Sequence, residues 1–323
     1  MSTATVTTGA RLHLGFQNLS LAHERLYGSL GVGIENPKAV IEATPSETLD
    51  VENGVIRQFA GRTIDLLDVA GARVTVRQGI PRHVGLGSGT QLALATYTAI
   101  ARAYDLEPDV RSAAPVLGRA GRSGVGVATF EGGGFVVDGG HPTERFTTEP
   151  PADGEWTVPP VLARHSMPDA WRFVLVIPAA SRGRSGAAEE RSIRTVVEDA
   201  EGQIADEIGA VVIRQLLPAV ATGDVDAFGA GLETIGRLNG CWYAEEQGGT
   251  YRPPAGELVS ELSSSPAFEG AGQSSWGPTV YGLTNADRVD GAREDAKSAL
   301  ERIEVEGDVI VTRPAAHGAT GPQ

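Results

Sequence analysis

Apolar and polar residues alternate along the first eighty positions of the chain, and this alternation predicts short strands. The alternating stretches are residues 5–8, 12–16, 39–43 and 73–77. Residues 91–104 are apolar on nearly every side, a pattern typical of a helix buried in the core. The first part of the chain is therefore predicted to place several strands before a buried helix.

The segment after this helix is rich in glycine and proline. Residues 105–117 begin with Asp-Leu-Glu-Pro and predict a helix with Pro108 in its first turn. The sequence GVATF-EGGG-FVVDGG, residues 126–140, predicts two strands joined by a glycine turn. Residues 146–168 carry prolines, threonines and acids without a clear period, so we expect a domain boundary there.

The second half of the chain starts a new set of elements. Expected strands cover residues 172–177, 279–283 and 308–312, and expected helices cover residues 187–221 with a break at Pro218, 224–239 and 290–303. Residues 315–323 are expected to form a loose tail. Because 323 residues exceed the usual size of a single domain, we predict two domains, residues 1–165 and 166–323.

Charge and composition narrow the range of partners. Asp and Glu number 41 against 27 Lys and Arg, and the net charge of −14 argues against nucleic acid as a partner. Only Lys38 and Lys297 are lysines, which suits a halophilic cytoplasm, although a GC-rich genome that replaces Lys by Arg produces the same pattern. The single cysteine, Cys241, excludes an internal disulfide and a cysteine-cluster metal site. With no signal segment and no apolar run near 18 residues, we expect a soluble cytoplasmic protein without membrane partners.

A glycine loop, PRHVGLGSGTQ at residues 81–91, lies between a predicted strand and the buried helix. Amides at a helix start favour anions, and glycine lets the backbone approach a phosphate. The hydroxyls of Ser88 and Thr90 are candidate ligands for Mg²⁺ as well as for phosphate oxygens. The candidate phosphate ligands are Gly85, Gly87, Ser88, Gly89, Thr90 and Gln91. A glycine-rich turn without a ligand is the alternative, since the loop is neither a P-loop nor a dinucleotide fingerprint.

Three further segments supply candidate site residues. GAGQSSWGPTVYG, residues 270–282, is a second glycine-rich loop that we expect to face the first across a cleft, with Trp276 offering an aromatic face. In ARLHLG, alternation places Arg11 and His13 on the same face of a strand. The third segment is GRSG, residues 121–124. The candidates from the three segments are Arg11, His13, Arg122, Ser123, Gln273, Ser274, Ser275, Trp276 and Thr279. Purely structural roles remain open for Trp276, His13 and Arg122.

ARLHLG, PRHVGLGSGTQ and GQSSWGPTVYG follow the order of the three motifs of the GHMP superfamily of small-molecule kinases. With GRAGRSGVGVATFEGGGFVVDGGH and WRFVLVIP, the chain resembles the β-ribofuranosylaminobenzene 5'-phosphate synthase family, a branch of that superfamily that does not contain kinases. The resemblance implies a two-domain α+β fold, with a ribosomal-protein-S5-like N-terminal domain and a ferredoxin-like C-terminal domain. It also implies a homodimer.

The family reaction couples phosphoribosyl pyrophosphate with 4-aminobenzoate or 4-hydroxybenzoate and releases CO₂ and pyrophosphate, in methanopterin biosynthesis. Departure of pyrophosphate needs Mg²⁺, loop amides and arginines to stabilise the anion. The ring carbon that bears the carboxylate attacks the sugar, so loss of CO₂ restores aromaticity without a strong base. The catalytic candidates are Arg25, Arg122, Ser123 and Glu131. Asp138 has two possible roles, as a Mg²⁺ or charge-compensating carboxylate or as a partner of backbone amides.

The chain departs from the family pattern after the first motif. Asn18 stands where the family has an acidic residue, and residues 27–29 read Tyr-Gly-Ser in place of Asp-Gly-Gly. Two alternatives therefore stay open: an ATP-dependent GHMP-type kinase and a catalytically silent ligand-binding relative. Bulky residues in the third motif argue against the kinase. Arg182, Arg184 and Ser185 form a candidate cationic lid or a solvated loop.

Overall fold

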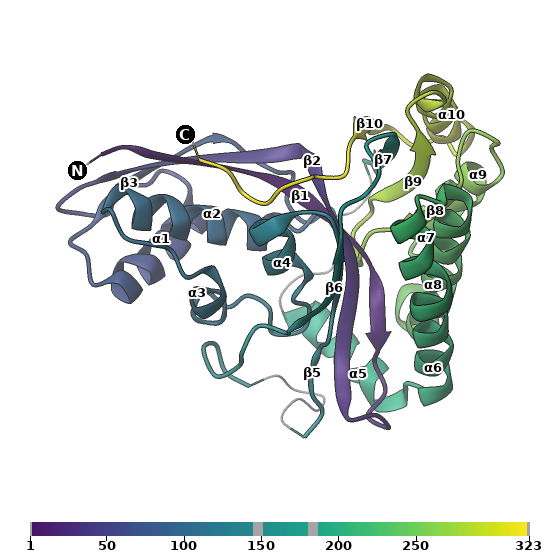
Figure 1. The fold of residues 1–323 in the computed structure, drawn as a ribbon, viewed down its shortest axis with the longest axis horizontal. Helices are drawn as coiled ribbons and strands as arrows, with labels where there is room; N and C mark the ends of the chain where they lie inside the picture. The colour runs from purple at the N-terminus through teal and green to yellow at the C-terminus, as the bar shows by residue number, and fades with distance from the viewer. Residues whose placement is uncertain (1, 145–150, 180–186, 322–323) are drawn as a thin grey trace.

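The computed structural model describes residues 2–144, 151–179 and 187–321, without the side chains of residues 187–190. The described strands form two antiparallel sheets in different halves of the molecule (Figure 1). The first sheet contains β1 (Ala4–Asn18), β2 (Arg25–Pro45), β3 (Ala72–Gln78), β4 (Phe135–Asp138), β5 (His141–Pro142) and β6 (Val161–His165). The second has the strand order β10 (Gly307–Thr312), β7 (Trp171–Pro178), β9 (Val280–Asn285) and β8 (Gly270–Gln273).

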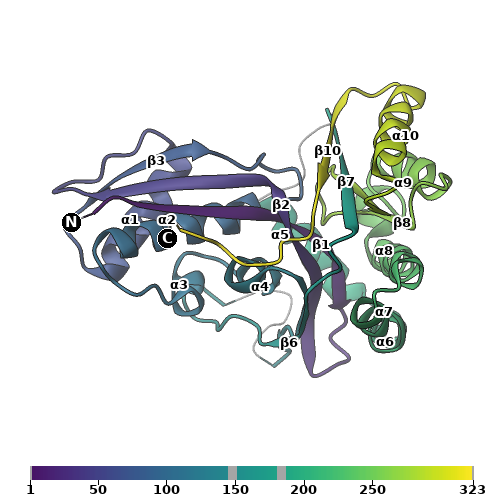
Figure 2. The ribbon, with the colours of Figure 1, turned by 45° about the horizontal axis from the view of Figure 1, so that its top comes forward.

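A long hairpin of β1 and β2 connects the two halves. The strands pair along their length with two register shifts, and the hairpin bends so that its closed end lies beside helix α6 (Gly202–Val211) (Figure 2). Asn18 stabilises this closed end, because its Nδ2 donates to the carbonyls of Ser20 at 2.8 Å and Arg25 at 2.7 Å. Asn18, which stands where the family pattern has an acidic residue, therefore stabilises the turn at the closed end of the hairpin.

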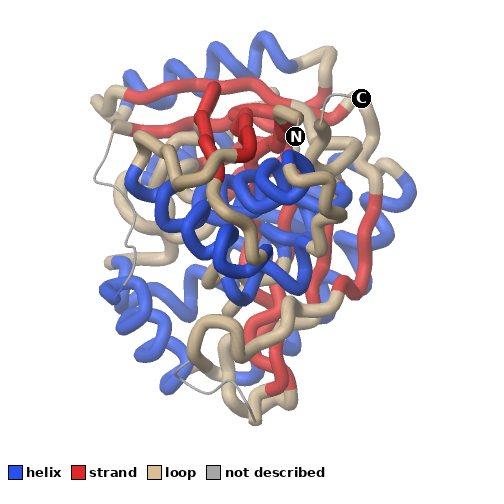
Figure 3. Tube along the Cα trace, turned by 90° about the vertical axis from the view of Figure 1, so that its left-hand side faces the viewer, coloured by secondary structure: helices blue, strands red, loops and turns tan. Residues whose placement is uncertain are grey.

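Four helices cover one face of the first sheet: α1 (Gly54–Leu67), α2 (Ser88–Ala103), α3 (Val110–Val116) and α4 (Val125–Gly132) (Figures 1 and 3). Helix α2 lies at the centre of this layer, in contact with β1 and β2 on one side and with the other three helices on the other. Almost all of its side chains are buried, as its apolar sequence predicts. This burial fixes the position of its N-terminus, which follows the glycine loop directly.

The second half is built around one long helix, α8 (Val225–Gln247). Its Phe228 contacts Phe135 of the first sheet and Trp171 of the second, with ring centroids 5.3 and 5.1 Å apart, so the helix packs between the sheets. Helices α9 (Ala255–Ser263) and α10 (Val289–Arg302) form a separate apolar cluster with the second sheet. The other described helical segments are α5 (Ala187–Asp199), the π-helical turn η1 (Val212–Leu216) and α7 (Leu217–Thr222). No helix within the described ranges is long and apolar enough to cross a membrane.

The prediction of two strands in residues 126–140 is wrong for the first of them. GVATF belongs to helix α4, and only FVVD forms a strand, β4. A short apolar run has no period that separates a buried helix from a buried strand, so the sequence alone could not decide. Gly133 and Gly134, at φ of 61° and 72°, make the turn between the two elements.

Other boundaries also differ from the expected ones. The expected helix over residues 187–221 breaks at residues 200–201 and not at Pro218, which lies in helical backbone that runs from α6 through the π-helical turn η1 into α7. Residues 161–165, within the expected linker, form strand β6 paired with β4. The expected loose tail instead follows the first sheet, where Thr320 pairs with Thr7 and the amide of Ala319 donates to Phe130 at 2.7 Å. Residues 319–320 therefore lie beside β1 and α4 of the first half.

Candidate active site

Hydrogen bonds join the three motif segments directly, although they lie far apart in the sequence. The Oγ of Ser274 accepts from the amide of His13 at 3.1 Å and donates to the carbonyl of Gly85 at 2.8 Å. The amide of Ser275 donates to the carbonyl of His13 at 3.1 Å. Thr279 donates through both Oγ1, at 2.5 Å, and its amide, at 3.3 Å, to the carbonyl of Val84. Strand β1, the glycine loop and the C-terminal loop thus form one unit.

Glycine is required where the two loops touch. Gly85 has φ of 94°, and a Cβ there would overlap the carbonyl oxygen of Ser274 and lie 3.1 Å from the Cα of Gly277. Gly87 caps the N-terminus of α2 with φ of 73°, and the side chain of Arg11 packs against it. Arg11 also donates to the carbonyl of Gly85 at 2.9 Å. The glycine loop is therefore held in shape from both sides.

The N-terminus of α2 opens next to this loop, with cationic side chains around it. Amides of the first helical turn have no intrahelical acceptor and favour anions. Arg11 approaches over Gly87, and Arg119 lies beside Gly89, with Nη1 3.0 Å from where a Cβ would stand. Burial lowers the pKa of Arg119, and within the described chain no carboxylate lies within ion-pair distance of it. Arg119 was not among the residues predicted for the site, and its only sequence signal was its place in the GRAGRSG segment.

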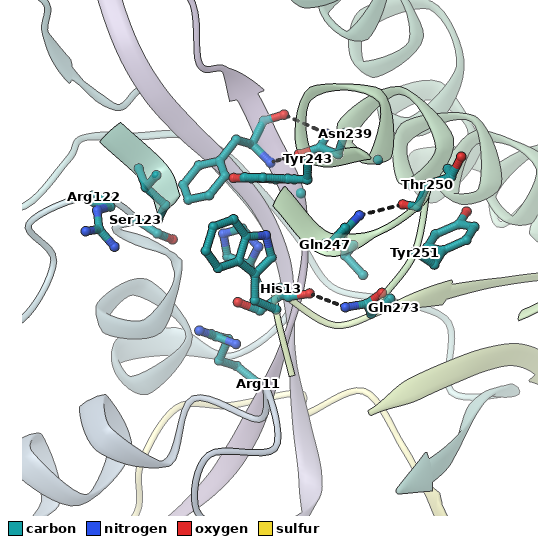
Figure 4. Close-up of a pocket in the computed structure, with 18 residues that line it drawn as sticks. Arg11, His13, Arg122, Ser123, Asn239, Tyr243, Gln247, Thr250, Tyr251 and Gln273 are labelled. Atoms are coloured by element: carbon teal, nitrogen blue, oxygen red, sulfur yellow. Dashed lines mark hydrogen bonds between the residues drawn. The ribbon is translucent and has the colours of Figure 1, made fainter. Parts of the chain in front are cut away.

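A cavity of about 160 Å³ lies between the two halves, next to the motif segments. Arg11 and His13 enter it from β1, Arg122 and Ser123 from the loop before α4, and Tyr243 from α8 (Figure 4). Its aromatic walls include Phe16, Tyr243 and Trp276. Tyr243 and Trp276 meet edge to face at 4.7 Å, and His13 meets Phe16 in the same way at 4.8 Å. The cavity therefore combines flat apolar surfaces with two arginines.

His13 is the most strongly perturbed group in the cavity. Its side chain is 4% exposed, and its pKa is lowered to about 3, first by burial and then by the charge of Arg11. The imidazole is therefore neutral throughout the physiological pH range, with one N–H donor and one nitrogen acceptor.

The loop that carries Arg122 and Ser123 is held by a buried carboxyl group. Asp138 is fully buried; its Oδ2 accepts from the amide of Gly124 at 2.8 Å and its Oδ1 from that of Gly140 at 2.9 Å. Burial raises the pKa of Asp138 to about 7, while these backbone bonds oppose the shift. Of its two expected roles, the structure supports backbone hydrogen bonding, since Asp138 does not line the cavity.

The structure brings together about half of the predicted site residues. Those that line the cavity are Arg11, His13, Arg122, Ser123, Gln273, Ser275 and Trp276. Gly85, Gly87, Ser88, Gly89 and Thr90 surround the start of α2. Arg182, Arg184 and Ser185 lie outside the described residues.

Three predicted ligands are instead used to hold the fold. The amide of Gln91 is buried, where it accepts from Thr8 Oγ1 at 2.7 Å and donates to the carbonyl of Gly126 at 2.8 Å. Both ends of this amide are bonded within the core, so the structure gives it a structural role, and binding of phosphate by Gln91 stays a prediction without support from its geometry. Ser274 and Thr279 are also fully buried, and their hydroxyls join the loops rather than face a substrate.

Two predicted catalytic residues lie away from the cavity. The guanidinium of Arg25 donates to the carbonyls of Gly139 and Gly140. Glu131, on α4, forms an ion pair with Arg111 at 2.8 Å. Neither residue lines the cavity, and a catalytic role for either stays a prediction. The bend of β1–β2 and helix α4 direct these side chains away from the cavity.

The side of the cavity that α8 forms was not predicted from the sequence. This side includes Asn239, Tyr243 and Gln247, and Tyr251 follows the helix (Figure 4). Asn239 also bonds both the amide and the carbonyl of Phe16, at 2.7 and 3.0 Å, which fixes β1 against the helix. The only sequence signal was the mixture of aromatic, amide and glycine residues at the end of a helical pattern.

Comparison with known proteins places the chain in a family. Residues 53–134 match the GHMP kinases N terminal domain. Beta-ribofuranosylphenol 5'-phosphate synthase of Methanothermobacter thermautotrophicus is 31% identical, covering 97% of both chains. The protein of the same description from Archaeoglobus fulgidus is 32% identical over 96% of this chain and 97% of its own. The chain belongs to the beta-ribofuranosylphenol 5'-phosphate synthase family.

Solved structures show the same fold in enzymes of distant sequence. Mevalonate pyrophosphate decarboxylase from Streptococcus pyogenes superimposes with a TM-score of 0.68 at 14% identity, covering 98% of this chain and 97% of its own. The mevalonate kinase of Methanococcus jannaschii gives a TM-score of 0.66 at 14% identity, with 97% and 99% covered. The family thus has the α+β GHMP-kinase fold, as the motif order predicted.

Proposed function

We propose that this protein condenses phosphoribosyl pyrophosphate with 4-hydroxybenzoate, releasing CO₂ and pyrophosphate and leaving a β-ribofuranosylphenol 5'-phosphate. Full-length similarity to synthases of that product supports the reaction. The observation that carries it in the structure is an aromatic-walled cavity that adjoins an anion-favouring helix N-terminus and arginines. 4-Aminobenzoate is an alternative acceptor with the same ring and carboxylate.

The site matches the main charge requirement of this reaction, stabilisation of the departing pyrophosphate. When the bond from C1 of the ribose to pyrophosphate breaks, its electron pair leaves with the pyrophosphate, and the amides of α2 with Arg11 and Arg122 stabilise that anion. The ring carbon bearing the carboxylate then bonds to C1. Loss of CO₂ returns the electrons of the broken C–C bond to the ring and restores aromaticity, so no ring proton has to be removed. Orientation and charge compensation carry the catalysis.

Magnesium fits this site only together with the substrate. Within the described residues, no group of three His, Cys, Asp or Glu side chains could hold a metal. Ser88 and Thr90 offer hydroxyl oxygens beside the start of α2, which suits Mg²⁺ when pyrophosphate supplies the other ligands. A bound Mg²⁺ would neutralise charge on the departing pyrophosphate.

The test is release of both products from a defined pair of substrates. Phosphoribosyl pyrophosphate with carboxyl-labelled 4-hydroxybenzoate should yield labelled CO₂ and pyrophosphate in equal amounts. Arg122→Ala should lower kcat/KM by about 100-fold, because a cation next to the departing anion is lost. Arg111→Ala is the matched control, since Arg111 pairs with Glu131 away from the cavity. This variant should keep kcat/KM within about threefold of the wild-type value.

Two outcomes contradict the proposal. One is the absence of both products with either acceptor at any salt concentration. The other is formation of ADP from ATP and a small metabolite, which would indicate a GHMP-type kinase. Tight binding of phosphoribosyl pyrophosphate without turnover would instead indicate a silent relative.

A further inference from the structure

A buried polar ring faces the cavity without a partner from the protein. Among the described residues, neither nitrogen of the His13 imidazole has a hydrogen bond, although the ring is 4% exposed and lines the cavity. Its backbone is bonded on both sides, at 3.1 Å to Ser274 Oγ and at 3.1 Å from the amide of Ser275. These bonds fix the backbone of His13, and the ring itself packs edge to face against Phe16, with centroids 4.8 Å apart. Buried polar groups in native proteins are normally paired, so a ligand is the expected partner.

The size of the cavity limits that ligand to a single ring. A cavity of about 160 Å³ compares with roughly 150 Å³ for an engineered apolar cavity that holds benzene. The walls formed by Phe16, Tyr243 and Trp276 match the faces and edges of such a ring. A bicyclic aromatic compound would extend beyond this volume.

Charge decides which part of the ligand meets His13. A carboxylate is matched by arginine, and Arg11 and Arg122 supply cations in the cavity. A neutral imidazole matches a neutral group that both donates and accepts a hydrogen bond, and it would compensate a buried carboxylate poorly. The hydroxyl of 4-hydroxybenzoate, opposite its carboxylate across the ring, is such a group.

We propose that His13 is the specificity-determining residue of the acceptor site and hydrogen-bonds the ring hydroxyl of a single-ring aromatic acid. The inference rests on the proposed function for the identity of the acceptor. It goes beyond that function by assigning the residue that recognises the group opposite the carboxylate. His13 acts by binding, and no proton transfer is required of it.

Calorimetric titration of the full chain with 4-hydroxybenzoate and with benzoate isolates this bond, because the two ligands differ only in the hydroxyl. The wild type should bind 4-hydroxybenzoate about 10-fold more tightly, the effect of one net hydrogen bond in a buried site. His13→Phe keeps the aromatic packing and should reduce the preference to less than about twofold while affinity for benzoate is kept. His13→Gln, which restores a donor and an acceptor, should recover part of the preference.

The matched control is His317→Phe, because His317 is exposed on the segment after β10 and does not line the cavity. This variant should keep the full preference. An unchanged preference in His13→Phe would overturn the proposal. If His13→Phe fails to fold, the wild type decides alone, since equal affinities of the wild type for benzoate and 4-hydroxybenzoate would contradict a bond to the hydroxyl.

A second ligand tests the size argument. 6-Hydroxy-2-naphthoate keeps the hydroxyl and carboxylate but has two rings, and it should bind the wild type at least about 10-fold more weakly. Equal binding would contradict a single-ring site. These titrations need no turnover, so they separate the two proposals. If the aromatic acids bind as expected but yield no product, only the proposed function is overturned. If product forms and His13→Phe changes neither its rate nor the ligand preference, only this inference is overturned.

Discussion

At the scale of single residues, the buried carboxyl of Asp138 shows how this protein positions a site from outside it. Its two oxygens hold the amides of Gly124 and Gly140, and the segment before Gly124 carries Arg122 and Ser123 into the cavity. His141 assists, with Nε2 3.0 Å from the carbonyl of Ala120. The loop depends on these bonds because few of its own side chains reach the core.

The raised pKa of Asp138 predicts how stability depends on pH. The folded-state pKa of about 7 lies above the ordinary 3.8, so between these values the folded protein holds a proton that the unfolded chain releases. The contribution of Asp138 to the free energy of unfolding is therefore complete below about pH 4 and is lost as pH rises through about 7. In urea unfolding, the stability difference between wild type and Asp138→Asn should fall by ~1 kcal/mol per pH unit across this window.

The control for this experiment is Asp153→Asn, which removes an exposed ion pair with Arg62. It should change the free energy of unfolding by less than ~1 kcal/mol at every pH. A stability difference for Asp138→Asn that does not vary from about pH 4 to 8 would show that the carboxyl is already ionised in the folded protein.

At the scale of elements, the contact between the two glycine-rich loops decides whether the site exists. Gly85→Ala would place a methyl group against the carbonyl of Ser274 at a φ of 94°, so the loops would separate. We expect a loss of about 2 kcal/mol in stability and at least a 100-fold loss in kcat/KM, because the start of α2 and β1 move apart. Unfolding and steady-state kinetics measure the two effects.

Gly79→Ala is the matched control, since Gly79 precedes the same loop without positive φ and a Cβ there meets nothing closer than 4.0 Å. It should leave activity unchanged and raise stability by up to about 1 kcal/mol. Equal effects of the two substitutions would mean that the loops do not depend on their close approach.

The elements also show what sequence reasoning could and could not predict. The order strand, glycine loop, buried helix was predictable, because glycine turns and an apolar helix are local features. Helix α4 was not, since a short buried run has no distinguishing period. The roles of Gln91 and Tyr243 were also out of reach, because Gln91 bonds to residues on β1 and α4 and Tyr243 packs against Trp276 of the distant C-terminal loop. Such contacts depend on how distant segments pack.

At the scale of the whole molecule, the two sheets share one site because β1, β2 and α8 span the boundary between them. The expected domain limits at residues 165 and 166 separate β6 from β7, but the last described residues return to the first sheet. Arg11 and Arg119 lie beside the N-terminus of α2, and Arg11 and Arg122 line the cavity, in a chain with a net charge of −14. We expect this separation of charge to favour anionic substrates at the cavity over the rest of the surface.

The same net charge predicts a dependence of stability on salt that extends beyond simple screening. Screening of repulsion between surface carboxylates is nearly complete by about 0.5 M, where the Debye length is only a few ångströms. A surface adapted to a salt-rich cytoplasm continues to gain stability above that concentration, and we expect the melting temperature to rise by roughly 10 °C between about 0.5 and 2 M KCl. Calorimetric melting in KCl measures this, with sucrose of equal osmolality as the control for general solute exclusion. A melting temperature that levels off at about 0.5 M would instead favour a GC-rich genome as the origin of the arginine-rich, lysine-poor composition.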